Sequence, residues 1–214
     1  MNRKPNARHR STPGTKTLSE KNVSANPFDQ FRKWFQAAVD ENIPQPNAMT
    51  LATASADGEP SSRIVLLKDA DDRGFTFYTN YESRKGGQLA LNPRAALLFY
   101  WPTLDRQVRI EGQVERLTRE ESMRYFDSRP RLSRIGAWAS RQSEIIENRS
   151  ILVAEFKKFE RQFSKGKVPL PDYWGGFRLI PGRMEFWQNR PNRLHDRICY
   201  VREHDAWKIV RLSP

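Results

Sequence analysis

The chain has 214 residues, of which 37% are hydrophobic, so it has enough apolar material for the core of an ordinary domain. Its 37 lysines and arginines outnumber 25 acidic residues and give a formal charge of +12, which predicts an anionic partner: nucleic acid, a membrane surface or a phosphorylated metabolite. A single cysteine, Cys199, excludes a disulfide framework and a multi-cysteine zinc site, and the three histidines offer no metal cluster.

The N-terminal stretch carries part of this charge. Residues 1–24 contain six lysines or arginines and one glutamate without apolar periodicity, so we expect a disordered basic tail there and a single domain over residues 25–214. No apolar run approaches the about 18 residues of a membrane span, and the N-terminus lacks the apolar core of a secretory signal. We therefore expect a cytoplasmic protein in a reducing compartment, without a membrane partner.

The first half of the chain predicts one helix followed by strands. In "NPFDQFRKWFQAAVDE", Asn26 is suited to cap a helix, Pro27 suits its first position, and apolar residues recur at helical spacing. The runs "MTLATAS", "SSRIVLLKD" and "GFTFYTN" predict strands joined by turns. A short helix capped by Ser83 follows, and then two strands, "RAALLFYW" and the alternating "DRQVRIEGQVERL".

The second half predicts two helices and then strands. Thr118 and Glu121 form a capping box for "REESMRYFDSR", which Pro130 should end or kink, and a longer helix should begin near Ser143. The apolar residues of that longer helix, expected in the core or at a subunit interface, are Ile145, Leu152, Phe156, Phe159 and Phe163. The final strands are "WGGFRLI", "RMEFWQN", "RLHDRICYVRE" and "AWKIVRLS". Strands on both sides of inserted helices predict a mainly β, α+β fold: an antiparallel barrel with helices packed outside.

Basic residues gather where the helix capped by Ser83 begins. Its first turn contains Arg84 and Lys85, although a helix N-terminus already carries about half a positive charge. Backbone N–H groups, a capping hydroxyl and two cations together suit a phosphate, with a solvated basic turn as the alternative. Arg63 and Lys68 of "RIVLLK" could join this site, but their odd separation places them on opposite faces of a regular strand, so a bulge or two contact points on one ligand would be needed.

Two later motifs also suit anionic or electron-rich ligands. In "YFDSRPRLS", Tyr125 and Arg129 share one helical face, although an exposed arginine beside a half-buried tyrosine fits that spacing equally well. In "RLHDR", strand alternation places Arg193, His195 and Arg197 on one face, where crowded cations favour a shared ligand over a solvated edge. An aromatic residue upstream, Trp187, could stack on a flat ring.

Other functions have weaker support. A nucleic-acid binder fits the basic charge and the aromatic residues, but most of the aromatics have core-like spacing and no motif of that class appears. No glycine-rich nucleotide loop follows a strand, and no Ser/His/Asp or Cys/His arrangement has a signature. The basic motifs therefore favour a small phosphorylated ligand.

In their order along the chain, these motifs resemble the pyridoxamine 5'-phosphate oxidases (pyridoxine 5'-phosphate oxidases), FMN enzymes of vitamin B6 metabolism. The resemblance covers roughly residues 27–214. It runs through "RIVLLK", "FYTNYESRKGGQLALNPRAALLF", "RQVRIEG", "YFDSRPRLSRIGAWASRQS", "VPLPDYWGGFRL", "EFWQ", "RLHDR" and "WKIVRLSP". It implies a split β-barrel of the antiparallel Greek-key type, in a homodimer with two FMN sites at the interface that each draw on both chains.

The resemblance also implies which residues form the site. Those implied for FMN are Arg63, Ile64, Val65, Leu66, Leu67, Lys68, Tyr78, Thr79, Ser83, Arg84, Lys85, Gln107, Gln142, Ser143, Trp187 and Arg197. Those implied for the substrate are Lys68, Tyr125, Arg129 and Ser133 at its phosphate, and Arg193, Leu194 and His195 near its pyridine ring. Arg193 and His195 are the candidate catalytic residues. The like-charged "RLHDR" face is then expected to be neutralised by ligands rather than by side chains.

The activity implied is the oxidation of pyridoxamine 5'-phosphate and pyridoxine 5'-phosphate to pyridoxal 5'-phosphate, with oxygen as acceptor and hydrogen peroxide as by-product. No metal or nucleic acid is implied. The alternative is a split-barrel protein that carries or reduces flavin without oxidising B6 vitamers; a second phosphate site argues against it. The N-terminal segment departs from the family, because it lacks the basic-aromatic pattern ending in Gly-Leu that can fold over the active site.

Overall fold

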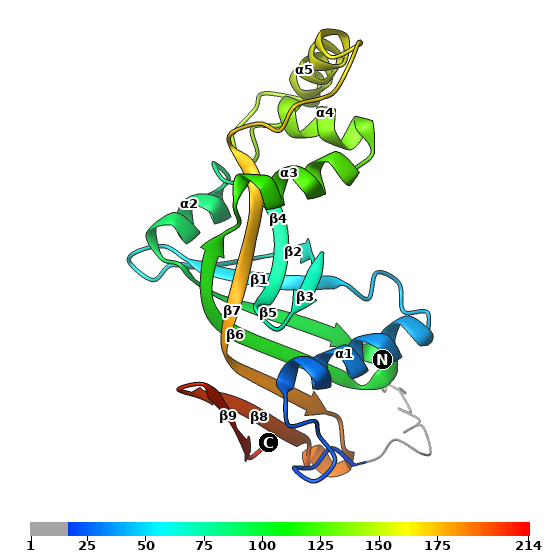
Figure 1. Cartoon of the computed structure of the whole chain (residues 1–214), viewed down its shortest axis with the longest axis vertical. Coiled ribbons are helices and arrows are strands. Elements are labelled where there is room, and N and C mark those ends of the chain that lie inside the picture. Colours follow the sequence, from blue (N-terminus) through cyan, green and yellow to red (C-terminus); the bar gives the residue numbers. More distant parts are fainter. Residues whose placement is uncertain (1–16) are drawn as a thin grey trace, which may run out of the picture.

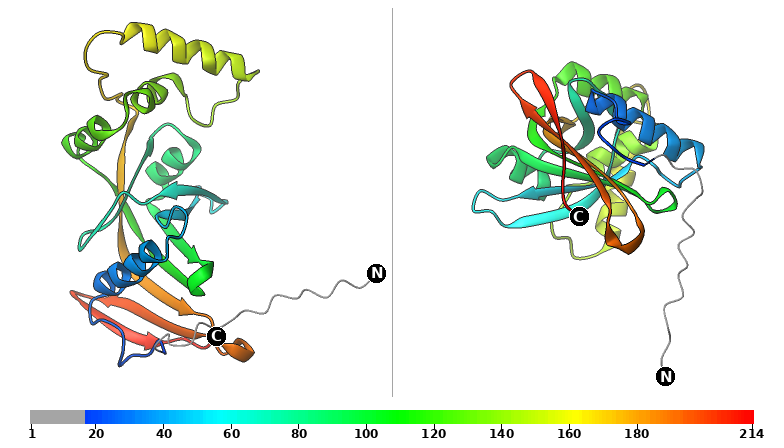
Figure 2. Two further views of the ribbon diagram at one scale, coloured as in Figure 1. Left: turned by 90° about the vertical axis from the view of Figure 1, so that its right-hand side faces the viewer. Right: turned by 90° about the horizontal axis from the view of Figure 1, so that it is seen from below.

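A computed structural model describes residues 17–214 as an elongated molecule built on one antiparallel sheet (Figure 1). Helices α3, α4 and α5 gather at one end of the molecule, and the β8–β9 hairpin forms the other end (Figures 1 and 2). The expected disordered tail falls largely on residues 1–16, which lie outside the described residues.

The sheet is the split β-barrel that the sequence predicted, curled and antiparallel throughout. Its strands are β1 (Ala48–Ala54), β2 (Pro60–Leu66), β3 (Asp69–Asp71), β4 (Gly74–Asn80), β5 (Arg94–Trp101), β6 (Arg106–Arg116), β7 (Trp174–Gln188), β8 (Asp196–Glu203) and β9 (Ala206–Arg211). Their order is β2-β1-β5-β6-β7-β4-β3, and β8 pairs with β7 and β9. The short β3 strand was not expected, because Asp69 was assigned to the end of the "SSRIVLLKD" strand, and Ala70 and Asp71 to the turn after it.

Strand β7 corrects a second expectation, since "WGGFRLI" and "RMEFWQN" form one strand rather than two. The break was expected at Pro181 and Gly182. A register shift at Glu111 and Gly112 of β6 accommodates both residues: Glu111 faces Arg183 and Gly112 faces Pro181. Such a bulge allows a strand to continue past a residue that cannot donate to the ladder.

Helix α1 (Pro27–Asp40) begins as the sequence predicted, with the Asn26 side chain accepting from the Phe28 N–H at 2.8 Å. Its buried face includes Phe28, Phe31 and Trp34. Phe31 lies edge-on to Phe75 of β4 at 4.9 Å and to Phe99 of β5 at 5.1 Å. The helix thereby closes the main core against the curled sheet.

The other helices are α2 (Arg84–Leu91), α3 (Arg119–Ser128), α4 (Arg131–Ala139) and α5 (Arg149–Gln162). Both predicted caps are present: Ser83 caps α2, and Thr118 forms a capping box with Glu121 on α3. Helix α4 was not expected, because Pro130 was interpreted only as a stop. Pro130 directly precedes α4, and its φ of −51° is compatible with the start of a helix.

Helix α5 starts later than predicted, at Arg149 with Asn148 as its cap, because Ser143 has a φ of 77° and lies in a loop. Ile145 is consequently fully exposed rather than in a core. Phe156, Phe159 and Phe163 do pack against a second apolar cluster, which lies among the helices. The buried members of that cluster are Phe126, Ile135, Val168, Leu170 and Trp174.

Residues 17–24, which were expected to belong to the disordered tail, are held against the body. The Tyr200 hydroxyl donates to the Ser24 carbonyl at 2.6 Å, and Arg211 donates to the Leu18 carbonyl and to Glu20. Leu18 is buried in the main core. The expected boundary at residue 25 is therefore too late. Among the described residues, no helix has the length and apolar character needed to cross a membrane.

Two neighbouring glycines in α2 provide a matched test of its packing. A Cβ on Gly86 would lie 2.1 Å from the Tyr81 carbonyl oxygen, whereas a Cβ on Gly87 would meet nothing within 4 Å. We expect Gly86→Ala to lower stability by about 1–3 kcal/mol through overpacking, and Gly87→Ala to raise it by about 0.5–1 kcal/mol through helix propensity. Thermal unfolding monitored by circular dichroism should show opposite shifts, and equal shifts would contradict this packing.

Candidate functional site

A cavity of about 980 Å³ lies where β2, β4 and the start of α2 face α3, α4 and the loop after α4. Its volume is at the upper end of the roughly 300–1,000 Å³ range of ligand pockets, so it has room for a ligand of considerable size. The predicted site residues that line it are Arg63, Ile64, Val65, Leu66, Lys68, Tyr78, Thr79, Arg84, Lys85, Tyr125, Arg129, Ser133, Gln142 and Ser143.

The start of α2 forms one wall of this cavity. Ser83 is fully buried and caps the helix, and Ser143 accepts a hydrogen bond from the Arg84 backbone N–H at 3.2 Å. The Lys85 ammonium donates to Thr79, to Ser83 and, at 2.9 Å, to the Gln142 side chain. The loop after α4, which carries Gln142 and Ser143, therefore contacts the N-terminus of α2. The predicted FMN site requires this contact, because it includes residues of both segments.

Several cations of the cavity lack acidic partners. Lys85 is only 7% exposed, yet its hydrogen-bond acceptors are all neutral. Arg63 likewise donates to neutral oxygens of Leu51, Thr53 and Ser61. No carboxylate of residues 17–214 lies within ion-pair distance of either side chain, whereas Arg84 pairs with Glu59 at 3.1 Å. Burying cations without counter-charge is costly, so this wall is suited to an anion.

A second cationic group lies on the α3–α4 side. Arg129, just after α3, lies 4.7 Å from the Trp174 ring, and its buried Nη1 has no hydrogen-bond partner among the described residues. The Lys68 ammonium lies 5.7 Å from the Tyr125 ring. Ser133 of α4 lines the same part of the cavity. An unpartnered guanidinium nitrogen, an ammonium and two hydroxyls form a fitting set of donors for a second oxyanion.

Stacked aromatic rings lie beside the second cationic group. Tyr78 stacks on Tyr125 at 3.9 Å and on Trp174 at 5.6 Å. Burial raises the pKa of Tyr78 to about 12, so its phenol remains neutral at physiological pH. These rings give the cavity an apolar wall beside its charged ends.

The parity objection to Arg63 and Lys68 disappears in the structure. Strand β2 ends at Leu66, so Lys68 lies outside it, where its backbone N–H donates to Thr76. Both cations consequently line one cavity. Leu67, also predicted to contact FMN, is instead buried in the main core and is absent from the cavity wall.

The remaining predicted residues lie toward the other end of the sheet. A separate cavity of about 630 Å³ is lined by Trp187, Arg193 and His195, among others, and shares no residue with the larger one. The ring centroids of Trp187 and His195 are 4.7 Å apart, and Gln107 of β6 is the cross-strand neighbour of Trp187. Within one chain, the structure therefore brings the predicted residues together as two groups rather than one.

The expected arrangement of "RLHDR" is wrong in two respects. Strand β8 starts only at Asp196, and Arg193 ends a short 3-10 helix (Pro191–Arg193), so alternation does not order these side chains. Arg197 is also neutralised by a side chain: it donates to both oxygens of the buried Glu185, at 2.7 and 3.1 Å. Glu185 comes from β7, and no local pattern connects it with this motif.

Sequence reasoning missed several cavity residues. Trp174 was interpreted only as part of a strand, yet it stacks beneath the second cationic group. Ser61 and Thr53 hold Arg63, and both donate to the Gln88 side chain of α2. The clustering of serines before "RIVLLK" was the only local signal for this network, because its partners come from three separate elements.

Comparison with known proteins gives a consistent result. Residues 35–163 match the family model described as pyridoxamine 5'-phosphate oxidase, and residues 174–214 match the pyridoxine 5'-phosphate oxidase C-terminal dimerisation region. Proteins named pyridoxine/pyridoxamine 5'-phosphate oxidase from Cyanothece sp. and Burkholderia mallei are 55% and 56% identical, each over 92% of this chain and over 93% and 94% of their own lengths.

Two solved structures share the fold. PhzG from Burkholderia lata, in complex with tetrahydrophenazine-1-carboxylic acid, superposes with a TM-score of 0.87 at 32% identity and covers 92% of this chain and 98% of its own. A pyridoxamine 5'-phosphate oxidase-related, FMN binding protein from Nostoc punctiforme gives 0.71 at 16% identity, covering 90% and 100%. The second likeness concerns the fold alone.

The pKa of Lys85 provides a direct test of the anion site. Burial and the nearby Arg63 lower it from 10.5 to about 8. Burial penalises the charged form, so this lysine destabilises the fold below about pH 8, and the penalty disappears as pH rises from about 8 to 10.5. We expect lysine ¹³Cε NMR to show one group titrating near pH 8 that is absent in Lys85→Met. Added sulfate should raise its pKa, and a sulfate-insensitive titration would contradict the anion site.

Proposed function

This chain belongs to the pyridoxamine 5'-phosphate oxidase family, and from this premise we propose that it binds FMN and oxidises pyridoxamine 5'-phosphate and pyridoxine 5'-phosphate to pyridoxal 5'-phosphate. Oxygen is the electron acceptor and hydrogen peroxide the by-product. With the amine, water is consumed and ammonia leaves. Relatives named for this activity at 55–56% identity support an oxidoreductase.

The observation that carries this proposal is the presence of two cationic groups in one cavity with aromatic rings beside them. The start of α2 offers Lys85 and Arg63 without acidic partners, and the α3–α4 side offers Arg129 with an unpartnered buried nitrogen. An FMN phosphate at the first group and a substrate phosphate at the second would supply the missing charge. A protein that only carries flavin has no use for the second group.

The residues around α2 fit the cofactor. Ser83 fixes the helix start, Arg84 and Lys85 hold the phosphate, and Gln142 and Ser143 close over them from the loop after α4. When bound, FMN supplies the hydride acceptor of the reaction. The main task of the protein is therefore to orient the substrate and to compensate its charge.

The substrate is held at its two ends by different groups. Lys68, Tyr125, Arg129 and Ser133 bind its phosphate, as their shared position on the cavity wall supports. Arg193 and His195, with Leu194 between them, orient the pyridine ring and assist the loss of the proton from the amine or alcohol. Trp187 and Arg197 contact the flavin from the same side.

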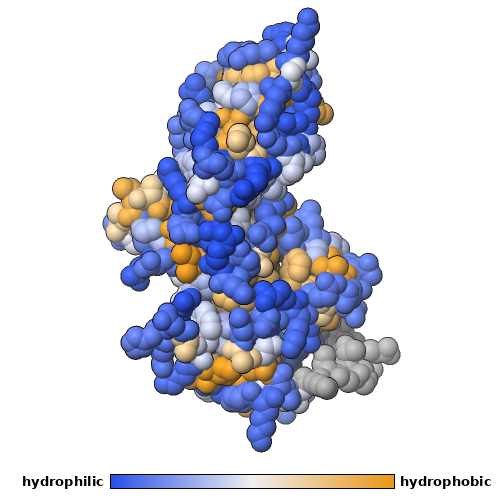
Figure 3. All heavy atoms as spheres, viewed as in Figure 1, coloured by the Kyte–Doolittle hydropathy of each residue, from blue (hydrophilic) through white to orange (hydrophobic). Residues whose placement is uncertain are grey.

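This division of roles requires a homodimer. The residues proposed for the two phosphates line the larger cavity, whereas Trp187, Arg193 and His195 line the separate smaller one. Residues 174–214, which carry these three residues, match the dimerisation region of the family. Both sets of residues include an exposed apolar side chain. Ile64, on the wall of the larger cavity, is 63% exposed, and Leu194, between Arg193 and His195, is 70% exposed. Figure 3 shows one face of the molecule that is mostly hydrophilic, with several separate hydrophobic patches. A second copy of the chain would complete each site and cover these residues.

The decisive experiment is purification followed by an absorbance spectrum and a peroxide assay with pyridoxamine 5'-phosphate. A yellow protein that produces peroxide and aldehyde is the expected result. Flavin uptake without oxidation would favour the alternative of a flavin carrier or reductase, and failure to take up added FMN would refute both. Unphosphorylated pyridoxine should be a poor substrate, because it lacks the phosphate. The same holds for tetrahydrophenazine-1-carboxylic acid, the ligand in the PhzG structure.

Arg129→Met tests the substrate-phosphate group. It keeps the bulk of the side chain but removes a charge-assisted contact worth about 1.5–3 kcal/mol, so KM should rise about ten- to a hundred-fold with little change in kcat or flavin content. Arg124 of the preceding helix α3 does not line the cavity, so Arg124→Met is the matched control. Steady-state kinetics with an unaltered KM would contradict this role for Arg129.

Mixed dimers test the shared site. If Arg129 of one chain and His195 of the other act on one substrate, co-expressed Arg129→Met and His195→Asn chains form heterodimers in which one site is intact. Random pairing should then restore about a quarter of wild-type activity at low substrate concentration, although each homodimer is impaired. The co-expressed mixture provides this measurement, and tagged heterodimers isolated from it by tandem affinity purification, with one of two sites intact, should show about half of wild-type activity. Absence of restoration would place both residues in a site within one chain.

A further inference from the structure

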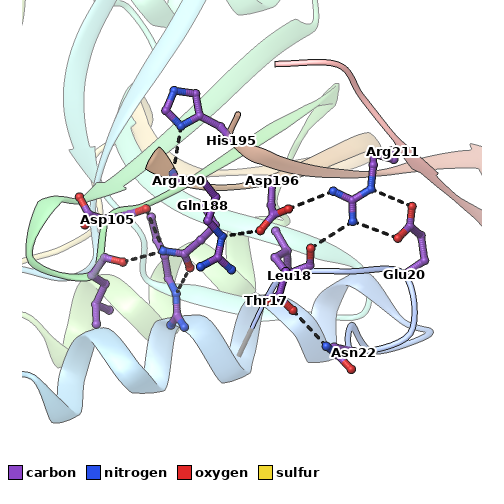
Figure 4. A network of polar contacts seen from close by, with 12 residues as sticks. Thr17, Leu18, Glu20, Asn22, Asp105, Gln188, Arg190, His195, Asp196 and Arg211 are labelled. Carbon is purple, nitrogen blue, oxygen red and sulfur yellow. Dashed lines mark hydrogen bonds and ion pairs between the residues drawn. The ribbon is translucent and has the colours of Figure 1, made fainter. Parts of the chain in front are cut away.

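We propose that Asp196 positions His195 by closing the base of the loop formed by residues 190–195 (Figure 4). The inference rests on the proposed function, in which His195 contacts the substrate. Asp196 itself is directed away from that contact, toward the arginines behind the loop.

The contacts form a short chain from Asp196 to the imidazole. Asp196 is the first residue of β8, is only 8% exposed, and accepts a hydrogen bond from Arg190 Nε at 2.6 Å. The backbone N–H of the same Arg190 donates to His195 Nδ1 at 3.1 Å. The Asp196 carboxylate thus holds the Arg190 side chain, and the Arg190 backbone holds the His195 ring.

The loop requires such a restraint because its backbone is strained. Asn192 and Arg193 are consecutive non-glycine residues with φ values of 57° and 61°. Left-handed conformations of this kind are unfavourable for residues other than glycine and persist only where the surroundings determine them. The ion pair between Arg190 and Asp196 connects the two ends of the strained segment at its base.

The hydrogen bond also sets the tautomer of the imidazole. Nδ1 of His195 accepts from a backbone N–H, so the neutral ring carries its proton on Nε2. Trp187 lies 4.7 Å from this ring, on the strand that pairs with β8. If Arg190 moved, both the tautomer and the ring orientation would lose their main determinant.

Asp196 also balances the charges behind the loop. Its second carboxylate oxygen accepts from Arg211 at 3.0 Å, and Arg211 donates in turn to Glu20 and to the Leu18 carbonyl. Loss of the carboxylate would leave Arg190 and Arg211 facing each other without the charge between them. The loop would then be displaced even though both arginines remained.

The kinetic test compares Asp196→Asn with Asp196→Glu and with Arg190→Met, which removes the partner side chain but retains its backbone N–H. We expect Asp196→Asn and Arg190→Met each to lower kcat about ten- to a hundred-fold, with KM and flavin content within about twofold of wild type. The double variant should be no worse than either single variant. Asp196→Glu should recover part of kcat. As control, Glu203→Gln removes an exposed ion pair with Lys208 on the same hairpin and should change nothing.

The second readout is independent of turnover. In ¹⁵N-histidine-labelled dimer, the signals of His195, identified by their loss in His195→Asn, should show a single tautomer protonated at Nε2. Asp196→Asn and Arg190→Met should shift them toward a mixture of tautomers. If the His195 signals stay unchanged in both variants, or kcat does, the positioning role is overturned. A wild-type protein without oxidase activity would instead refute the proposed function, and the NMR signature would still decide the role of Asp196.

Discussion

Uncompensated positive charge inside the large cavity is the constraint on which the rest of the structure depends. Lys85 is held by neutral oxygens at the start of α2, and Arg129 leaves a buried nitrogen without a partner. Cations in this state persist because a rigid framework surrounds them: the buried Ser83 cap, the stacked rings of Tyr78 and Trp174, and the loop carrying Gln142. The fold thus maintains buried cations at a cost in free energy, and the proposed binding of oxyanions would offset that cost.

The sequence predicted those elements whose determinants are local. Asn26, Ser83 and the Thr118–Glu121 pair start helices through contacts within three residues, and each start lies where it was expected. Helix α4 and the unbroken β7 were missed for the opposite reason. Pro130 ends one helix and directly precedes another, and the local sequence fits either outcome. Strand β7 continues past Pro181 because of a bulge in its pairing with β6, and this pairing is a non-local property.

The candidate site shows the same division. Motif spacing placed Tyr125 and Arg129 on one helical face, and only the family resemblance added Lys68 to them; all three line one cavity. The charge balance of "RLHDR" could not be inferred in this way, because Glu185, which neutralises Arg197, is contributed by β7. A residue pattern indicates which side chains share a face. It does not indicate which distant residue faces them, and that partner decides whether a cationic row needs a ligand.

The continuous strand β7 has a geometric consequence for the assembly. It runs from the end of the molecule that carries α3, α4 and α5 toward the β8–β9 hairpin (Figure 1). Its first residue, Trp174, lines the large cavity, and Trp187, near its end, lines the smaller one. At about 3.3 Å per residue, the thirteen residue steps from Trp174 to Trp187 correspond to roughly 43 Å of extended chain. The number of residues in β7 therefore sets how far apart the two groups of site residues in one chain lie. In a two-fold pair, that fixed length would bring both composite sites into register at once, so neither could be adjusted without displacing the other.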